Sequence, residues 1–263
     1  MLRRAALILT AVIVISALAA KLRRGDTLSI SPLAKPTATP VSMGFDETVV
    51  SRDVTFEKLT WYALQTGIFS SQEAADAKAL AYADRGAPGY VSPDGDKFRV
   101  LIACYDTETD AASVRDRLAS AQEVDVYLHR WELPEMSLRL TGMAGQLDVA
   151  EAGMQLLRQS AALLRDAAIA MDRGESDPDD ALRLLSGLND QYVLWRRTAR
   201  QRFVQPYPAM IGALLSLADG WDTQYTDLKG ASGSATALSA SLKIHAMEQY
   251  AHLAQLYALI QAP

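Results

Sequence analysis

The sequence has little cysteine and histidine, and it has no excess of positive charge. Its single cysteine, Cys104, excludes a disulfide within the chain, although a domain with a sufficient core needs none even outside the cytoplasm. The formal net charge is -5, whereas a nucleic-acid-binding protein needs a basic surface to neutralise phosphates. We therefore expect no nucleic-acid partner.

Motifs for catalysis are also missing. The chain contains no Gly-x-Ser-x-Gly, no P-loop and no dinucleotide-binding fingerprint. His245, Glu248 and His252 share one predicted helix face, but the two histidines are seven residues apart, not the usual four of a helical metal site. The aspartates of residues 177–180 suit a helix start, because the glycine and glutamate of a calcium loop do not follow them. We predict that the protein is not an enzyme and holds no metal or cofactor.

The N-terminus predicts a location outside the cytoplasm. Residues 5–20 are mostly apolar and uncharged, and lysine and arginine flank them on both sides. Because basic flanks can snorkel to lengthen a short span, we favour a retained transmembrane signal-anchor over residues 1–24. The alternative is a secreted protein whose signal peptide is cleaved near Ala19, since residues 17–19 have a small-x-small pattern.

A linker is expected next, over residues 25–53. Residues 31–40 are rich in proline and threonine and show no periodicity. Such a segment would hold a folded domain away from a membrane.

Residues 54–134 read as strand, helix, strand, strand, helix, strand. We expect strands at residues 61–69, 87–91, 97–104 and 124–131. One helix, capped by Ser70 or Ser71, should run to Asp84, and another, capped by Asp106 or Thr107, should run to Leu118. Two β-α-β halves of this kind predict a small βαββαβ, ferredoxin-like domain. Its antiparallel sheet would carry both helices on one face and leave the other face open to a ligand.

The remainder, residues 135–263, predicts a helical bundle, which makes the whole chain α+β. The first helix carries an apolar seam with alternating spacings of three and four: Leu140, Met143, Leu147, Ala150, Met154, Leu157, Ala161, Leu164, Ala168 and Met171. Such a heptad pattern could form a coiled-coil dimer. We favour burial within the chain, because three further predicted helices also carry apolar stripes.

One basic cluster stands out in this helical part. It consists of Arg196, Arg197, Arg200 and Arg202. We expect these side chains to be solvated at a helix end, where they complement its dipole. Contact with an acidic partner or an anionic lipid headgroup is the alternative.

Two strand motifs of the α/β part resemble a known family. Residues 61–69 read WYALQTGIF, and residues 98–105 read FRVLIACY. Over about residues 58–132 this pattern is similar to the SPOR domain, whose first strand reads aromatic-aromatic-apolar-x-Gln-x-Gly-x-Phe. The sequence departs from the family at Ala103 and Cys104, where Gly-Pro is usual.

The resemblance implies binding to the glycan strands of peptidoglycan, particularly strands stripped of stem peptides, in cell division or sporulation. Sugars are recognised by aromatic faces and by directional hydrogen bonds. Strand alternation places the candidate glycan-binding residues on the open face, together with His129: Trp61, Gln65, Arg99, Leu101 and Tyr127.

Each of these candidates also has a plainer interpretation. Trp61 could be a strand-end aromatic packed under the linker, and Arg99 could be a solvated residue paired with Asp125. A protein-interaction scaffold of the cell envelope is therefore the second functional hypothesis. In a scaffold, the helices bind a protein partner and could cover the sheet, whereas a glycan-binding protein should expose that face.

Overall fold

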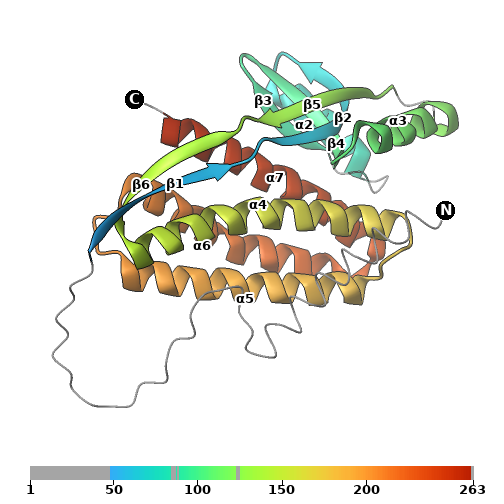
Figure 1. Cartoon of the computed structure of the whole chain (residues 1–263). Coiled ribbons are helices and arrows are strands. Elements are labelled where there is room, and N and C mark those ends of the chain that lie inside the picture. Colours follow the sequence, from blue (N-terminus) through green and yellow to red (C-terminus); the bar gives the residue numbers. More distant parts are fainter. Residues whose placement is uncertain (1–47, 84–86, 88, 123–124, 262–263) are drawn as a thin grey trace. The chain divides into compact units, whose positions relative to one another are not determined.

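The computed structural model describes residues 48–83, 87, 89–122 and 125–261 (Figure 1). These residues pack into one compact unit. The predicted signal-anchor and most of the predicted linker lie outside the described residues. Among the helices that are described, none is long and apolar enough to cross a membrane.

The first part of the unit is a four-stranded antiparallel sheet with two helices. Its strands have the order β3-β4-β2-β5. The elements are β2 (Leu59–Phe69), α2 (Gln72–Ala83), β3 (Tyr90–Asp94), β4 (Lys97–Tyr105), α3 (Glu108–Gln122) and β5 (Tyr127–Leu133). Both helices pack on one face of this sheet, which confirms the predicted arrangement.

Local side chains explain where these elements begin and turn. The Ser71 hydroxyl accepts a hydrogen bond from the backbone N–H of Ala74, and the Thr107 hydroxyl accepts one from that of Asp110. Each therefore caps the helix that follows it, as the sequence predicted. Gly95 has a φ of +61° in the turn between β3 and β4, a conformation that glycine adopts without strain.

A second, two-stranded sheet was not predicted. It pairs β1 (Val49–Phe56) with β6 (Met136–Met143) in antiparallel register. Two predictions are corrected here. Residues 49–53 are not linker but the start of β1, and Leu140 and Met143 belong to β6 and not to the first helix of the bundle. Alternate residues of this two-stranded ribbon, including Val54 and Met136, are buried in the core.

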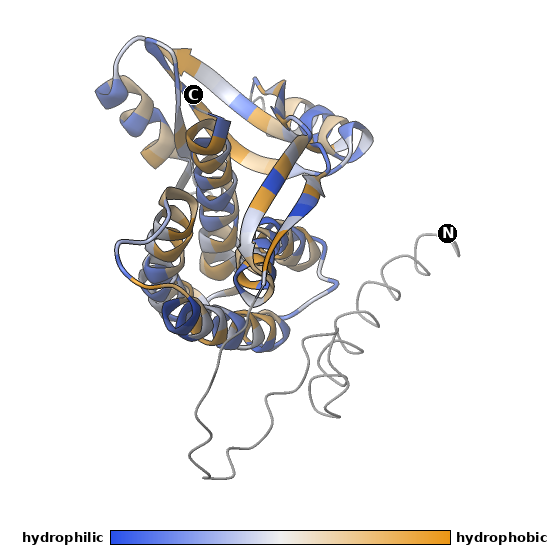
Figure 2. Ribbon diagram, turned by 60° about the vertical axis from the view of Figure 1, so that its left-hand side comes forward, coloured by the Kyte–Doolittle hydropathy of each residue, from blue (hydrophilic) through white to orange (hydrophobic). Residues whose placement is uncertain are grey.

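The bundle consists of four helices. These are α4 (Ala144–Asp172), α5 (Pro178–Arg202), α6 (Ala209–Gly230) and α7 (Ala235–Gln261), with a short 3₁₀ turn, η1 (Ala231–Gly233), before α7. The Asp177 side chain accepts a hydrogen bond from the N–H of Asp180, which confirms the predicted start of α5. Each bundle helix carries both apolar and polar residues (Figure 2).

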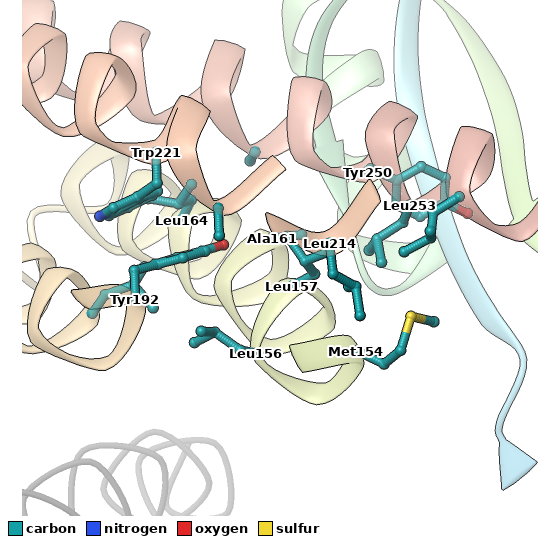
Figure 3. Packing of buried hydrophobic residues seen from close by; sticks show 14 of the residues in the cluster. Met154, Leu156, Leu157, Ala161, Leu164, Tyr192, Leu214, Trp221, Tyr250 and Leu253 are labelled. Carbon is teal, nitrogen blue, oxygen red and sulfur yellow. The ribbon is translucent and has the colours of Figure 1, made fainter. Parts of the chain in front are cut away.

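The predicted seam is buried inside the chain from Leu147 to Ala168, and Met171 at its end is partly buried. Its central members Met154, Leu157, Ala161 and Leu164 are at most 3% exposed (Figure 3). The ring of Tyr192 on α5 stacks on the ring of Trp221 on α6, with the ring centroids 4.6 Å apart. The seam is thus part of a bundle core, which is the alternative favoured from the sequence.

Candidate functional site

The register of the sheet brings the five predicted ligand residues to one face. Trp61 pairs directly with Trp131, and Gln65 pairs with Leu101 on one side and Tyr127 on the other. Arg99 lies two residues before Leu101 on β4. The opposite face packs on α2 and α3 through Leu64, Ile102, Val126 and Leu128, as alternation predicted.

This face is not open along its whole length, which corrects the expectation from the sequence. Helices α4 and α7 pack on it, and α7 runs along this side of the sheet (Figure 1). Trp61 and Leu101 are both 0% exposed, within the same core cluster as the bundle. The physical reason is that this end of the face and the seam of α4 are both apolar, and each buries the other.

Exposure rises across the face from the covered end to the far end. Gln65 is 8% exposed, the Arg99 side chain 22% and Tyr127 62%. Trp61 and Leu101 are therefore inaccessible in this conformation, whereas Arg99 and Tyr127 are available. The ligand roles of all five residues stay predictions.

At the covered end, one residue of the bundle enters an aromatic cluster on the sheet. The ring of Tyr250 on α7 lies 4.5 Å from that of Trp61 and 4.4 Å from that of Trp131, and Tyr90 stacks on Trp131 at 6.3 Å. The Tyr250 hydroxyl donates to the carbonyl oxygens of Trp131, at 2.8 Å, and Leu59, at 3.1 Å. We call Trp61, Trp131 and Tyr90 the aromatic platform.

Trp61 has one further neighbour and one unused donor. The guanidinium of Arg165 on α4 lies 5.0 Å from the ring centre, in cation–π geometry. The buried indole N–H finds no hydrogen-bond partner among the described residues. A buried unpaired donor costs free energy, so this contact of sheet and bundle is not fully satisfied.

At the open end, a fixed guanidinium is the main feature. Arg99 donates to the side-chain oxygen of Gln65 at 2.6 Å and to the carboxylate of Asp94 at 2.6 Å. Burial and the nearby charge of Arg99 lower the pKa of His129. Arg99 thus pairs with Asp94, not with Asp125 as the plainer interpretation proposed, and Gln65 orients it.

Several residues of this face were not among the predicted ligands. Trp131 and Asp94 could have been found, since Trp131 continues the alternation of Tyr127 and His129, and Asp94 directly precedes Gly95 in the turn between β3 and β4. Tyr250 could not have been found in this way, because it is about 190 positions from β2 and belongs to a helix outside the α/β part.

The remaining candidates of the sequence are placed as follows. The Nδ1 atom of His245 lies 2.7 Å from the Oε2 atom of Glu248. Among the described residues, no group of side chains suited to hold a metal ion occurs. The basic cluster is not simply solvated at a helix end, because Arg196 forms two hydrogen bonds of 2.7 Å to Asp222 on α6. Arg200 likewise pairs with Asp219, so these two arginines link α5 to α6.

Comparison with known proteins now adds to this geometry. Residues 60–128 match the model of the SPOR domain family. This segment is a SPOR domain. It covers β2 from Thr60 through the start of β5, so most of the face described above belongs to it, whereas His129 and Trp131 lie just beyond the matched residues.

Two further comparisons gave little beyond this match. One solved structure similar to the chain is the solution structure of the peptidoglycan-binding domain of the B. subtilis cell wall lytic enzyme CwlC. The identity is 21%, with 27% of this chain and 90% of that chain covered and a TM-score of 0.25. No curated protein matches this chain.

Proposed function

We propose that this chain binds the glycan strands of peptidoglycan outside the cytoplasm, held at the membrane by its N-terminal segment. A role in cell division, sporulation or cell-wall organisation follows from such binding. The observation that carries the proposal is the SPOR domain at residues 60–128, because this family consists of peptidoglycan-binding modules.

The open end of the sheet has the chemistry that sugar recognition needs. Tyr127 offers an exposed ring face, and Arg99 offers donors whose direction is fixed by Gln65 and Asp94. A guanidinium held in place loses little further rotamer freedom when it binds, which favours affinity. In this proposal Arg99 and Tyr127 contact the glycan, and Gln65 positions Arg99.

Sedimentation with purified sacculi tests this proposal. Arg99→Ala and Tyr127→Ala should each weaken binding about tenfold or more, a loss of roughly 1.4 kcal/mol. Leu80→Ala is the matched control, because Leu80 is an exposed apolar residue on α2, which packs on the other face. Amidase treatment of the sacculi should increase binding of the unaltered chain. Unchanged binding by both face variants would contradict the proposal.

A scaffold of the cell envelope is the second candidate. It is favoured by one observation, namely that α4 and α7 cover part of the predicted ligand face. In that function the SPOR domain holds the bundle in place, and the bundle binds a protein partner. Absence of sacculus binding by the unaltered folded chain would favour this candidate.

A further inference from the structure

Tyr250 occupies the aromatic platform with both its ring and its hydroxyl, the ring tilted by 40° to that of Trp61 and by 45° to that of Trp131. A bound sugar typically lays an apolar ring face against aromatic side chains and directs its hydroxyls to polar groups of the backbone. The ring centroid of Tyr250 lies within 4.5 Å of the ring centroids of Trp61 and Trp131. Its hydroxyl donates to two backbone carbonyl oxygens of the sheet. The three aromatic side chains of the platform are therefore assembled, but Tyr250 of the same chain covers them.

Two breaks between strands, which we call the hinge, separate the sheet from the rest of the unit. β1 stops at Phe56 and β2 begins at Leu59, while β5 stops at Leu133 and β6 begins at Met136. Phe56 pairs with Met136, and Leu59 pairs with Leu133, so the two breaks lie opposite each other. The sheet is thus joined to the ribbon only through two adjacent two-residue segments, residues 57–58 and 134–135.

Helix α7, which carries Tyr250, is held firmly in the bundle. α7 packs more extensively on α4 than on any other element, and its buried residues extend from Leu238 to Tyr257. The ribbon also packs on α4 through both of its strands. A movement that uncovers the platform is therefore a rotation of the sheet about the hinge, with α7 left in the bundle.

Among the residues that the structure describes, few polar contacts fasten the sheet in its closed position. Beside the hydroxyl of Tyr250, Arg158 on α4 donates to the carbonyl oxygen of Glu57 at 2.7 Å, within the hinge itself. At the far side, Arg173 lies 3.5 Å from Asp110 on α3, and both side chains are about 40% exposed. A long and exposed ion pair of this kind contributes little. The Tyr250 hydroxyl and the cation–π contact of Arg165 with Trp61 are accordingly the polar contacts that fasten the platform itself.

We infer that the aromatic platform is a second part of the glycan site and that glycan and Tyr250 compete for it. This inference rests on the proposed function. In the closed state a ligand reaches only the open end with Arg99 and Tyr127. Rotation of the sheet releases Tyr250 and lets a longer stretch of glycan extend over Trp61 and Trp131.

Cys104 is a natural reporter for this movement in the full chain. It lies on β4, fully enclosed in the cluster shared by sheet and bundle, and burial raises the pKa of its thiol to about 12. Because the thiolate is the reactive form, the closed protein should react slowly with a maleimide. Tyr250→Phe removes the hydroxyl contacts, so it should accelerate labelling of Cys104 at least tenfold.

The matched control is Tyr192→Phe. Tyr192 is also buried and also uses its hydroxyl, bonded to Ser160 and Gln249, but it lies within the bundle. Equal acceleration by the two variants would mean that Cys104 becomes accessible only by global unfolding, and would overturn the inference. Acceleration by Tyr250→Phe alone supports the hinge.

Sacculus sedimentation of the same variants tests the competition. If the platform binds glycan, Tyr250→Phe should bind at least threefold more tightly than the unaltered chain, and Tyr192→Phe should not. Faster labelling with unchanged, Arg99-dependent binding would overturn the competition and leave the proposed function intact. Absence of binding by every variant, including those in which Cys104 is exposed, would overturn both.

Discussion

At the scale of single residues, one glycine allows the close packing of two bundle helices, α4 and α5. A methyl group added at Gly153 on α4 would lie 2.5 Å from the Trp195 ring of α5. The same ring donates its N–H to the carbonyl oxygen of Val149 at 2.9 Å, so it cannot move away without losing a hydrogen bond. Glycine here serves packing between helices, at the expense of helix propensity.

Gly153→Ala should therefore destabilise the protein by about 1–3 kcal/mol, because overpacking outweighs the gain in helix propensity. Gly187→Ala is the control, since Gly187 lies in a helix with open space around its Cα, and should stabilise by roughly 0.4–1 kcal/mol. Urea unfolding followed by circular dichroism measures both. If both variants change the free energy of unfolding in the same direction, the ring of Trp195 can move aside at little cost.

At the scale of elements, the sequence predicted those whose signals are local. Ser71, Thr107 and Asp177 mark helix starts because a cap contacts residues only three positions away. The faces of β2 and β4 followed from alternation. The ribbon was missed because β1 and β6 are about 90 residues apart, and because the three-and-four spacing of the seam happens to continue backward into Leu140.

The candidate site was predictable to a similar extent. Alternation correctly placed Arg99 and Tyr127 on the face opposite α2 and α3, since this depends only on strand periodicity. The burial of Trp61 was not predictable, because it depends on Tyr250 from a helix far along the chain. When helices far along the chain cover a strand, the sequence of that strand shows no pattern from which the cover can be predicted.

The ribbon should prove essential to stability. Val54→Asp places an unpaired charge where a valine is 6% exposed against the core, and should cost more than about 4 kcal/mol. Thr55→Asp changes the neighbouring residue on the exposed face of β1 and should cost less than about 1 kcal/mol. Thermal unfolding compares the two. A mild effect of Val54→Asp would show that β1 can detach without unfolding the rest.

At the scale of the whole molecule, the SPOR domain and the bundle share one core. A cluster of buried residues extends from Val54 through Trp61 to Tyr257, and it includes members of the ribbon, the sheet and all four bundle helices. The change from strand to helix pattern near residue 134 therefore does not separate two hydrophobic cores. Both parts should unfold together.

Mild proteolysis should release a stable fragment that begins between residues 27 and 48 and continues through the bundle. The proline- and threonine-rich composition of residues 31–40 predicts cleavage there, whereas the shared core protects the later chain. Mass spectrometry of the products measures the termini. A persistent fragment that ends near residue 134 would instead indicate two independently stable domains.

The two aligned breaks have a mechanical consequence. β1 continues along the chain into β2, an interior strand of the sheet, so the route from Val49 to Gln65 is one extended backbone. A pull on the chain ahead of β1, opposed by a ligand held on the sheet, is transmitted along this route by covalent bonds. Helices α4 to α7 lie beside this backbone route and do not themselves carry the force. Tension between the two ends is thus carried by the backbone of β1 and β2 and not by the contacts between the sheet and the bundle.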